Sequence, residues 1–378
     1  MTTIEYLEQL VAFESTSSLS NLGISDYVEG VLQGLGFETE RLEYDDSNGI
    51  RKASIVGKRS NGSASTGGMA YSGHTDVVPA TDWFQPEHGP YKAVIDSGRL
   101  HARGSADMKG SIACMLAAIE RVDGASQTAP IYFLASADEE IGFGGAIDIV
   151  ARSKFFREMV EHDTNTIVGE PTELEVVYSH KGACKLIATS HGRAAHSSTR
   201  EGINANLAMI PFLSVMKEIY DETETDPKWH NNDFDPPTIT MNIGINDHTD
   251  ATNITPPESI CTVHSRPMPG TDMTSIIDRA QAAAAAAGID LKVETEAGPF
   301  ATDKESAIVQ DMLEIAGKSQ AHTVGYGTDA SPMSALRNLV VFGPGNIFQG
   351  HTNNEWIALE QLEAGTDTFE KLIRHWCV

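Results

Sequence analysis

Residues 131–140, IYFLASADEE, join a short apolar run to a cluster of carboxylates. The apolar half is typical of a buried strand, and the glycine-rich IGFGGA that begins at residue 141 predicts a turn after it. Successive side chains of a strand point to opposite sides, whereas a turn can direct both toward one cleft. Glu139 and Glu140 can therefore share a site, with one of them binding a cation while the other moves a proton. Such a pair needs further ligands from elsewhere in the chain.

The composition limits the class of partner. The 378-residue chain is long enough for roughly two to three domains. It has 53 acidic and 27 basic residues, for a formal charge of −26. This charge repels phosphate backbones, so we do not expect nucleic acid as a partner. The acidic excess fits a well-solvated surface, a high-salt environment or a cationic ligand.

The sequence shows no signal for a membrane or an oxidising compartment. The first residues, MTTIEYLEQLVAFEST, have no basic segment before an apolar core, and no run reaches the about 18 apolar residues of a membrane span. The cysteines are scattered without a CxxC pair, which predicts neither a disulfide framework nor a thiolate zinc site. We therefore expect a cytoplasmic protein with no membrane partner.

Histidines and carboxylates recur where other apolar runs end. Strands alternate with helices in this part of the chain, which predicts an α/β sheet with its site along the C-terminal edge of the strands. Five further side chains are expected at that edge. They are His74 and Asp76 after the run at 67–73, Asp107 before the helix predicted within 100–122, Glu170 after the run at 165–168, and His351 near the C-terminus.

The pattern changes from about Ser179. Residues 179–296 read strand, helix, strand, strand, helix, strand, and this βαββαβ order is the signature of a ferredoxin-like domain. An α/β pattern resumes at about Gly298. The sequence therefore predicts one catalytic domain formed by residues 1–178 and 297–378, interrupted by a smaller inserted domain at 179–296.

Each ligand candidate has a simpler reading when it is considered alone. His74 could be a hydrogen-bonded or surface histidine, and Asp107 could be the N-cap of the helix that follows it. Together, two histidines and three carboxylates offer the nitrogen and oxygen ligands that suit zinc, and Asp107 is placed to bridge two metals. Asp76, two residues after His74, can accept the other imidazole N–H. Of Glu139 and Glu140, one would bind metal and the other act as the general base.

Ordered motifs over nearly the whole chain resemble one family. GHTDVVP with a following Trp83, then RGSADMKG, SADEE, GEPTE, GRAAHSS and GHTNNEW are similar to the motifs of the di-zinc aminoacylase and carboxypeptidase superfamily. The resemblance implies a zinc-peptidase-like catalytic domain, with a central mixed sheet flanked by helices. It also implies that the inserted domain is a lid and that two chains form a homodimer through it.

The resemblance assigns roles to individual residues. It implies one Zn²⁺ bound by His74, Asp107 and Glu170, and a second bound by Asp107, Glu140 and His351, with Co²⁺ or Mn²⁺ as substitutes. Glu139 becomes the general acid and base. A water shared by the metals, with its pKa lowered toward about 7, loses a proton to Glu139 and attacks an amide carbonyl. The products are a carboxylate and a free amine.

Other matched positions imply contacts with substrate. His196, in GRAAHSS, would reach an active site, commonly that of the dimer partner, and polarise the carbonyl or hold its oxyanion. Arg266 and Asn253 match positions around the substrate carboxylate, although Asn253 could merely organise the turn before Pro256. Gly327 and Thr328, with the turn at 343–345, could supply backbone donors.

Four segments are most similar to acetylornithine deacetylases within the superfamily. They are RGSADMKG, SADEEIG, GEPTELEVVYSHKG and GPGNIFQGH. The similarity implies removal of an acetyl group from N-acetyl-L-ornithine or a related N-acyl amino acid, a step of arginine biosynthesis. The alternatives are desuccinylation of succinyl-diaminopimelate, a broader aminoacylase or dipeptidase, and a non-catalytic homologue that binds a metabolite.

Overall fold

The computed structural model describes residues 1–61 and 67–378, which form two compact units. The first comprises Met1–Ser179, Ala301–His322 and Thr328–Val378, and the second comprises His180–Phe300 and Thr323–Gly327. The second unit thus includes a short return segment that the sequence-based boundaries leave out. The backbone explains its membership, because the Lys181 N–H donates to the Val324 carbonyl over 3.2 Å.

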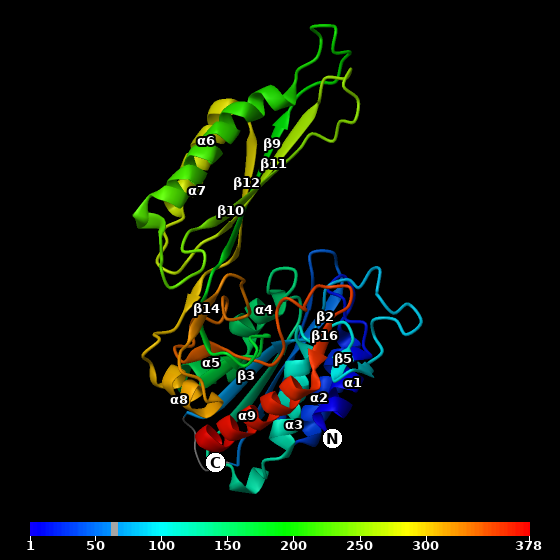
Figure 1. Ribbon diagram of the computed structural model, residues 1–378, viewed down its shortest axis with the longest axis vertical. Coiled ribbons are helices and arrows are strands. Elements are labelled where there is room, and N and C mark those ends of the chain that lie inside the picture. Colours follow the sequence, from blue (N-terminus) through cyan, green and yellow to red (C-terminus); the bar gives the residue numbers. More distant parts are fainter. Residues whose placement is uncertain (62–66) are drawn as a thin grey trace. The chain divides into compact units, whose positions relative to one another are not determined.

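A mixed nine-stranded sheet, most of whose residues belong to the first unit, confirms the predicted fold class (Figure 1). Strands β6, β3, β7 and β15 are parallel neighbours, whereas β1, β2 and β8 pair antiparallel to their neighbours. Along the sheet the strands are β1 (Glu38–Asp45), β2 (Arg51–Arg59), β6 (Ile131–Ser136), β3 (Met69–His74), β7 (Asn165–Val168), β15 (Leu339–Val341), β8 (Val177–His180) and β13 (Phe300–Ala301), with β14 (His322–Val324) paired to β8.

Helices cover both faces of this sheet (Figure 1). Ile131, Phe133 and Ala135 of β6 belong to a core shared with five helices, while Tyr132 and Leu134 point to the other face. The five helices are α1 (Thr3–Val11), α2 (Leu22–Gly34), α3 (Lys109–Glu120), α8 (Ala307–Ala316) and α9 (Leu359–Cys377). Helices α4 (Gly144–Arg152) and α5 (Lys154–Glu161) lie on the opposite face, and a 3₁₀ turn spans Gly124–Ser126.

Helix α1 ends at Val11 and does not continue through residues 12–17. The residues that follow pair with the segment after β3 instead. Ser17 N–H donates to the Val77 carbonyl over 3.1 Å, and Val77 N–H donates to the Ser15 carbonyl over 3.0 Å. These tertiary hydrogen bonds replace those of a longer helix and bring residues 15–17 to the C-terminal edge of the sheet.

A second, three-stranded sheet of this unit was not expected from the sequence. It is formed by β4 (Val94–Asp96), β5 (Arg99–His101) and β16 (Trp356–Ala358), in the order β16-β5-β4. Trp356 is the partner of His101 in the antiparallel register. This pairing places the segment that precedes β16 beside the loop that follows β5.

The second unit has the predicted βαββαβ order. Its elements are β9 (Ala183–His191), α6 (Ala205–Thr225), β10 (Thr240–Asn246), β11 (Glu258–Arg266), α7 (Thr274–Ala287) and β12 (Asp290–Ala297), with a 3₁₀ turn at Pro227–Trp229. The antiparallel sheet runs β10-β11-β9-β12, and α6 and α7 cover one of its faces (Figure 1). Within the described ranges, no helix is long and apolar enough to cross a membrane.

Candidate active site

The parallel strands of the central sheet deliver four of the predicted site residues to one edge. His74 is the last residue of β3, and Glu139 and Glu140 follow β6, whose Ser136 is the register partner of His74. Glu170 lies two residues beyond β7. Because neighbouring parallel strands end together, these side chains meet at the edge where α/β folds bind their ligands.

Five of the predicted residues form two groups that could hold metal ions. In the first group, His74 Nε2 lies 3.1 Å from Asp107 Oδ1 and 3.9 Å from Glu170 Oε1. In the second, His351 Nε2 lies 3.4 Å from Asp107 Oδ2 and 2.9 Å from Glu140 Oε2. Ligands about 2.0–2.2 Å from a tetrahedral zinc are themselves roughly 3.3 Å apart, so both groups have the required spacing.

Asp107 belongs to both groups and presents one carboxylate oxygen to each. The alternative role of helix N-cap does not apply, because the residue before α3 is Met108 and it makes no side-chain cap. Asp107 is instead held by its backbone, whose N–H donates to Glu355 Oε1 over 3.0 Å. Its two oxygens are therefore arranged as a bridge between neighbouring cation sites.

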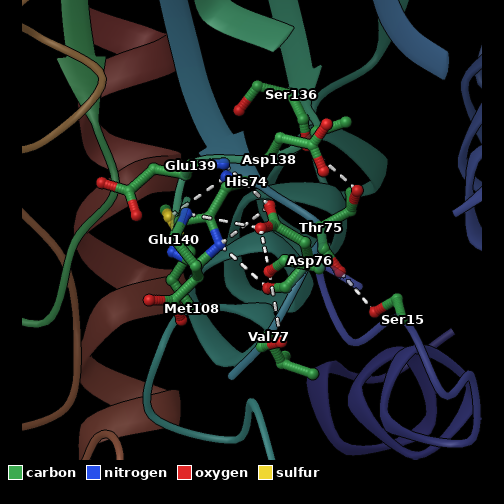
Figure 2. Close-up of polar contacts among 12 residues, drawn as sticks. Ser15, His74, Thr75, Asp76, Val77, Met108, Ser136, Asp138, Glu139 and Glu140 are labelled. Carbon is green, nitrogen blue, oxygen red and sulfur yellow. Dashed lines mark hydrogen bonds and ion pairs between the residues drawn. The ribbon is translucent and has the colours of Figure 1, made fainter. Parts of the chain in front are cut away.

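The structure gives Asp76 a role that differs from the one expected. The backbone carbonyl of Asp76 lies 3.0 Å from His74 Nδ1, whereas its carboxylate is 3.7 Å from that nitrogen. The carboxylate accepts hydrogen bonds from the backbone N–H groups of Glu139, over 3.2 Å, and Glu140, over 3.4 Å (Figure 2). Asp76 thus orients the imidazole with its backbone and the acidic turn with its side chain.

The site concentrates negative charge away from water. Burial raises the pKa of Glu139 and Glu170 well above the usual range, and the charges of neighbouring carboxylates add to the effect. Burial also raises the pKa of Glu140. For Asp107, burial raises the pKa, but hydrogen bonds from His351 and His74 outweigh it and the pKa lies below its usual value.

These residues fit a pair of divalent cations. Buried carboxylates are costly unless a cation pairs with them. Glu140 Oε1 is buried and has no hydrogen-bond partner within residues 1–61 and 67–378, so it is available as a ligand atom. Two imidazole nitrogens and three carboxylates match the preferences of zinc and of similar transition metals.

Metal binding is expected to release protons. Hydrogen bonds to Asp107 and Glu140 raise the pKa of His351 to about 10 in the metal-free protein, so the ring is protonated at neutral pH. A metal requires the neutral ring, and affinity should therefore rise with pH below about 10. Calorimetric titration with zinc at pH 7.5 in buffers of different ionisation enthalpy measures the release. His351→Ala should release fewer protons, and equal release by both proteins would contradict this account.

Sequence reasoning missed Glu355, which organises the loop of the bridging ligand. This fully buried carboxylate accepts from Arg103 Nη1 over 2.6 Å, and from the backbone N–H groups of Gly104, Ala106 and Asp107 over 2.8–3.0 Å. Glu355 is the acid in the motif GHTNNEW, so the sequence contained a signal for it. The groups that it binds are brought to it only by the pairing of β16 with β5.

Asp329 is a second buried acid that was not singled out. Its carboxylate accepts a hydrogen bond from Ser136 Oγ at the end of β6, and burial raises its pKa to about 6. The neighbouring Thr328 was predicted, for its backbone, as a substrate contact. Thr328 is buried and its hydroxyl accepts from the Ala330 N–H over 3.1 Å.

The other predicted substrate residues lie in the second unit. His196 and Asn253 are close together there, because Ser197 N–H donates to the Asn253 carbonyl over 2.9 Å. Arg266 is at the opposite end of β11 from Glu258, which pairs with His191. At about 3.3 Å per residue, the two ends of β11 are roughly 26 Å apart. The second unit therefore does not bring Arg266 together with His196 and Asn253. Gly327 belongs to the return segment of this unit.

Comparison with known proteins identifies the class. The family model for Peptidase family M20/M25/M40 matches residues 70–375. The chain belongs to this family and is a hydrolase. Its members are metal-dependent, in agreement with the two ligand groups described above.

Relatives with similar sequences extend over the whole chain. The acetylornithine deacetylase of Proteus mirabilis is 30% identical, with 100% of this chain and 97% of the relative covered. The acetylornithine deacetylase of Myxococcus xanthus is 29% identical, with 98% and 96% covered. These matches support an amidohydrolase activity.

Solved structures share the fold at lower identity. A tripeptidase from Staphylococcus aureus aligns with a TM-score of 0.77 and 20% identity, over 99% of this chain and 97% of that one. An M20 family metallo-carboxypeptidase from Sulfolobus solfataricus aligns with a TM-score of 0.76 and 16% identity, over 98% of both chains. A Bacillus subtilis protein described as a dinuclear metal binding peptidase aligns with a TM-score of 0.64 and 12% identity, over 98% and 96%.

Proposed function

We propose that this hydrolase removes the acetyl group of an N-acetyl amino acid such as N-acetyl-L-ornithine. The observation that carries the proposal is the shared ligand Asp107, with one oxygen in each metal-binding group and the half-buried Glu139 beside them. The full-length similarity to acetylornithine deacetylases supports the choice of substrate. The reaction would serve arginine biosynthesis in the cytoplasm, where reduced cysteines such as the four buried ones of this chain are stable.

Two zinc ions would be held by the two groups, with Co²⁺ or Mn²⁺ as substitutes for the same donors. When bound, such a pair lowers the pKa of a water molecule from about 15.7 toward 7 and polarises the amide carbonyl. Glu139 lies outside both groups and remains available to accept the proton of the attacking water. Its raised pKa then suits delivery of that proton to the departing amine.

The basic residues around the site favour an acetyl group over a succinyl group. A succinyl substrate has a second carboxylate that requires a cation. The fully buried basic residues of this unit are already engaged, Lys52 with Asp138, Arg103 with Glu355, and Lys109 with a backbone carbonyl. This arrangement supports deacetylation over desuccinylation.

Exposed apolar residues favour a broader aminoacylase as the second candidate. Ile141 directly follows Glu140 and is 58% exposed, and Phe348 precedes His351 by three residues and is 83% exposed. Because Glu140 and His351 are in contact, Ile141 and Phe348 both lie on segments that contribute to the same metal-binding group. Such residues could accept an apolar acyl group or amino-acid side chain.

A substrate panel separates these activities. The zinc-loaded enzyme is assayed for amine release from N-acetyl-L-ornithine, N-acetyl-L-methionine, succinyl-diaminopimelate and a dipeptide. We expect kcat/KM to be highest for N-acetyl-L-ornithine. A preference for N-acetyl-L-methionine that is lost in Phe348→Ala would favour the aminoacylase. Absence of hydrolysis across the panel would contradict the proposed activity.

We further propose that the first unit is the catalytic domain. The second unit is a lid through which two chains form a homodimer. Strand β10 is an edge strand, and edge strands expose unpaired backbone groups that can pair with another chain. Five exposed apolar residues support a protein contact on this unit. They are Ile203, Leu207, Ile210, Ile245 and Ile254. Sedimentation of the wild type and of Leu207→Glu tests the dimer, and a monomeric wild type would contradict it.

His196 is suited to donate a hydrogen bond to the reacting carbonyl oxygen. The Ser198 N–H donates to His196 Nδ1 over 3.2 Å, so the proton of the neutral ring lies on Nε2. Since Arg266 is at the far end of the same sheet, one small substrate cannot contact both residues from a single second unit. We propose that His196 and Asn253 serve the active site of the partner subunit, whereas Arg266 contacts the substrate carboxylate.

A mixed dimer tests the position of His196. His196→Ala should lower kcat by about 10²–10³-fold, as for other oxyanion donors. The inactive Glu139→Gln and His196→Ala proteins are then mixed and allowed to exchange subunits. If His196 acts in the partner's site, each mixed dimer has one site with both residues, and activity returns. If activity does not return despite exchange, His196 does not act across the dimer.

A further inference from the structure

Lys52 is a buried lysine in β2 that lies outside all the motifs of the site. Its side chain is 1% exposed, and its Nζ lies 2.7 Å from Asp138 Oδ1. The same ammonium donates to the backbone carbonyls of Ser17, over 2.6 Å, and Leu19, over 2.8 Å. One buried cation therefore joins the segment after α1 to the acidic turn after β6.

Asp138 is the residue of that turn with an unusual backbone. Its φ is +56°, in the left-handed region that is uncommon for residues other than glycine, although aspartate adopts it more often than most. Its other carboxylate oxygen accepts from the Tyr44 hydroxyl over 2.8 Å. The contacts of Lys52 and Tyr44 stabilise this conformation, and Glu139 and Glu140 follow directly.

A second connection closes a ring of contacts around the turn. Ser17, whose carbonyl binds Lys52, donates its hydroxyl to Asp76 Oδ2 over 2.7 Å. The Asp76 carboxylate then accepts the backbone N–H groups of Glu139 and Glu140. The turn is thus held from its Asp138 end by Lys52 and from its backbone by Asp76, and Ser17 links the two supports.

We propose that Lys52 is a positioning residue, which fixes Glu139 as the proton carrier and Glu140 as a metal ligand. This inference rests on the proposed function. Without the ammonium, the Asp138 carboxylate stays buried with only the Tyr44 hydroxyl, and the segment of Ser17 loses an anchor. The turn would then leave the conformation that directs both glutamates into the site.

The effect is specific to one of the two metal-binding groups. Glu140 belongs only to the group with Asp107 and His351. In the other group, His74 is held in β3 by pairing with β6 and β7, and Glu170 follows β7. Loss of Lys52 should therefore weaken one metal site and leave the other close to normal.

Lys52→Met tests this inference on the full-length protein. Zinc binding to the metal-free protein is measured in competition with a chelator, and kcat and KM are measured with zinc in excess. We expect one of two zinc sites to weaken by about 10–100-fold, as for other residues that orient a ligand. We also expect kcat to fall at least tenfold with KM within threefold of the wild type. Lys58→Met is the control, because Lys58 is on the same strand and pairs with Glu158.

The outcomes separate positioning from general stability. Equal weakening of both zinc sites, or a lower melting temperature with unchanged zinc binding and kcat, would overturn the proposal. If Lys52→Met does not fold, Tyr44→Phe removes the other support of Asp138 and should produce a smaller loss at the same single zinc site. An unchanged zinc profile in Tyr44→Phe would then overturn it. Zinc binding requires no substrate, so this readout does not depend on the proposed deacetylation.

Discussion

Glu139→Gln is expected to lower kcat by about 10³-fold while the protein keeps both metal ions. Proton transfer by a positioned side chain contributes about 10²–10⁴-fold to catalysis. Glutamine has the same shape as glutamate but cannot carry the proton between water and amine. Glu139 is not a member of either metal-binding group, so metal content should not change. Elemental analysis and kinetics on the same preparation measure the two quantities.

Glu161→Gln is the matched control, because Glu161 is an exposed residue at the end of α5. It should have normal kcat and metal content. Near-normal turnover by Glu139→Gln would show that another group moves the proton. Loss of one metal ion in that variant would show that Glu139 is a ligand, and that Glu139 and Glu140 have exchanged their proposed roles.

Asp107→Asn should abolish activity and weaken binding of both metal ions. An amide has one neutral oxygen and cannot bridge two cations as a carboxylate does. The loss of affinity should exceed the roughly 10–100-fold caused by residues that only orient a ligand. Metal content after dialysis against a weak chelator measures this loss.

Glu170→Gln provides the comparison, because Glu170 belongs to only one group. It should keep one metal ion after the same dialysis, whereas Asp107→Asn should keep neither. Retention of one ion by Asp107→Asn would contradict a shared ligand, because it would show that one of the two sites binds its ion without Asp107.

Local patterns in the sequence predicted the strands that end at the candidate site and the order of elements in the second unit. The apolar run before Glu139 and the run before His74 are strands, and both end at the same edge of the mixed sheet. The predicted βαββαβ order is present in the second unit. These features were predictable because hydrophobic periodicity and strand length are properties of neighbouring residues.

Contacts between distant segments could not be predicted in this way. The end of α1 depends on hydrogen bonds between residues 15–17 and Val77, and the position of Glu355 depends on the pairing of β16 with β5. The three residues of each short strand give too weak a pattern to reveal such a pairing. Lys52 is in an ordinary strand sequence, and only its burial against Asp138 distinguishes it.

The sequence by itself placed His74, Glu139, Glu140 and Glu170 at one edge of the sheet, because parallel strands end side by side. The tertiary structure determined which groups each of these side chains contacts. It presents the two oxygens of Asp107 to two different histidines, and it directs the Asp76 carboxylate to the backbone of the Glu139–Glu140 turn. These arrangements depend on distances of about 3 Å between segments far apart in the chain, which only the packed fold defines.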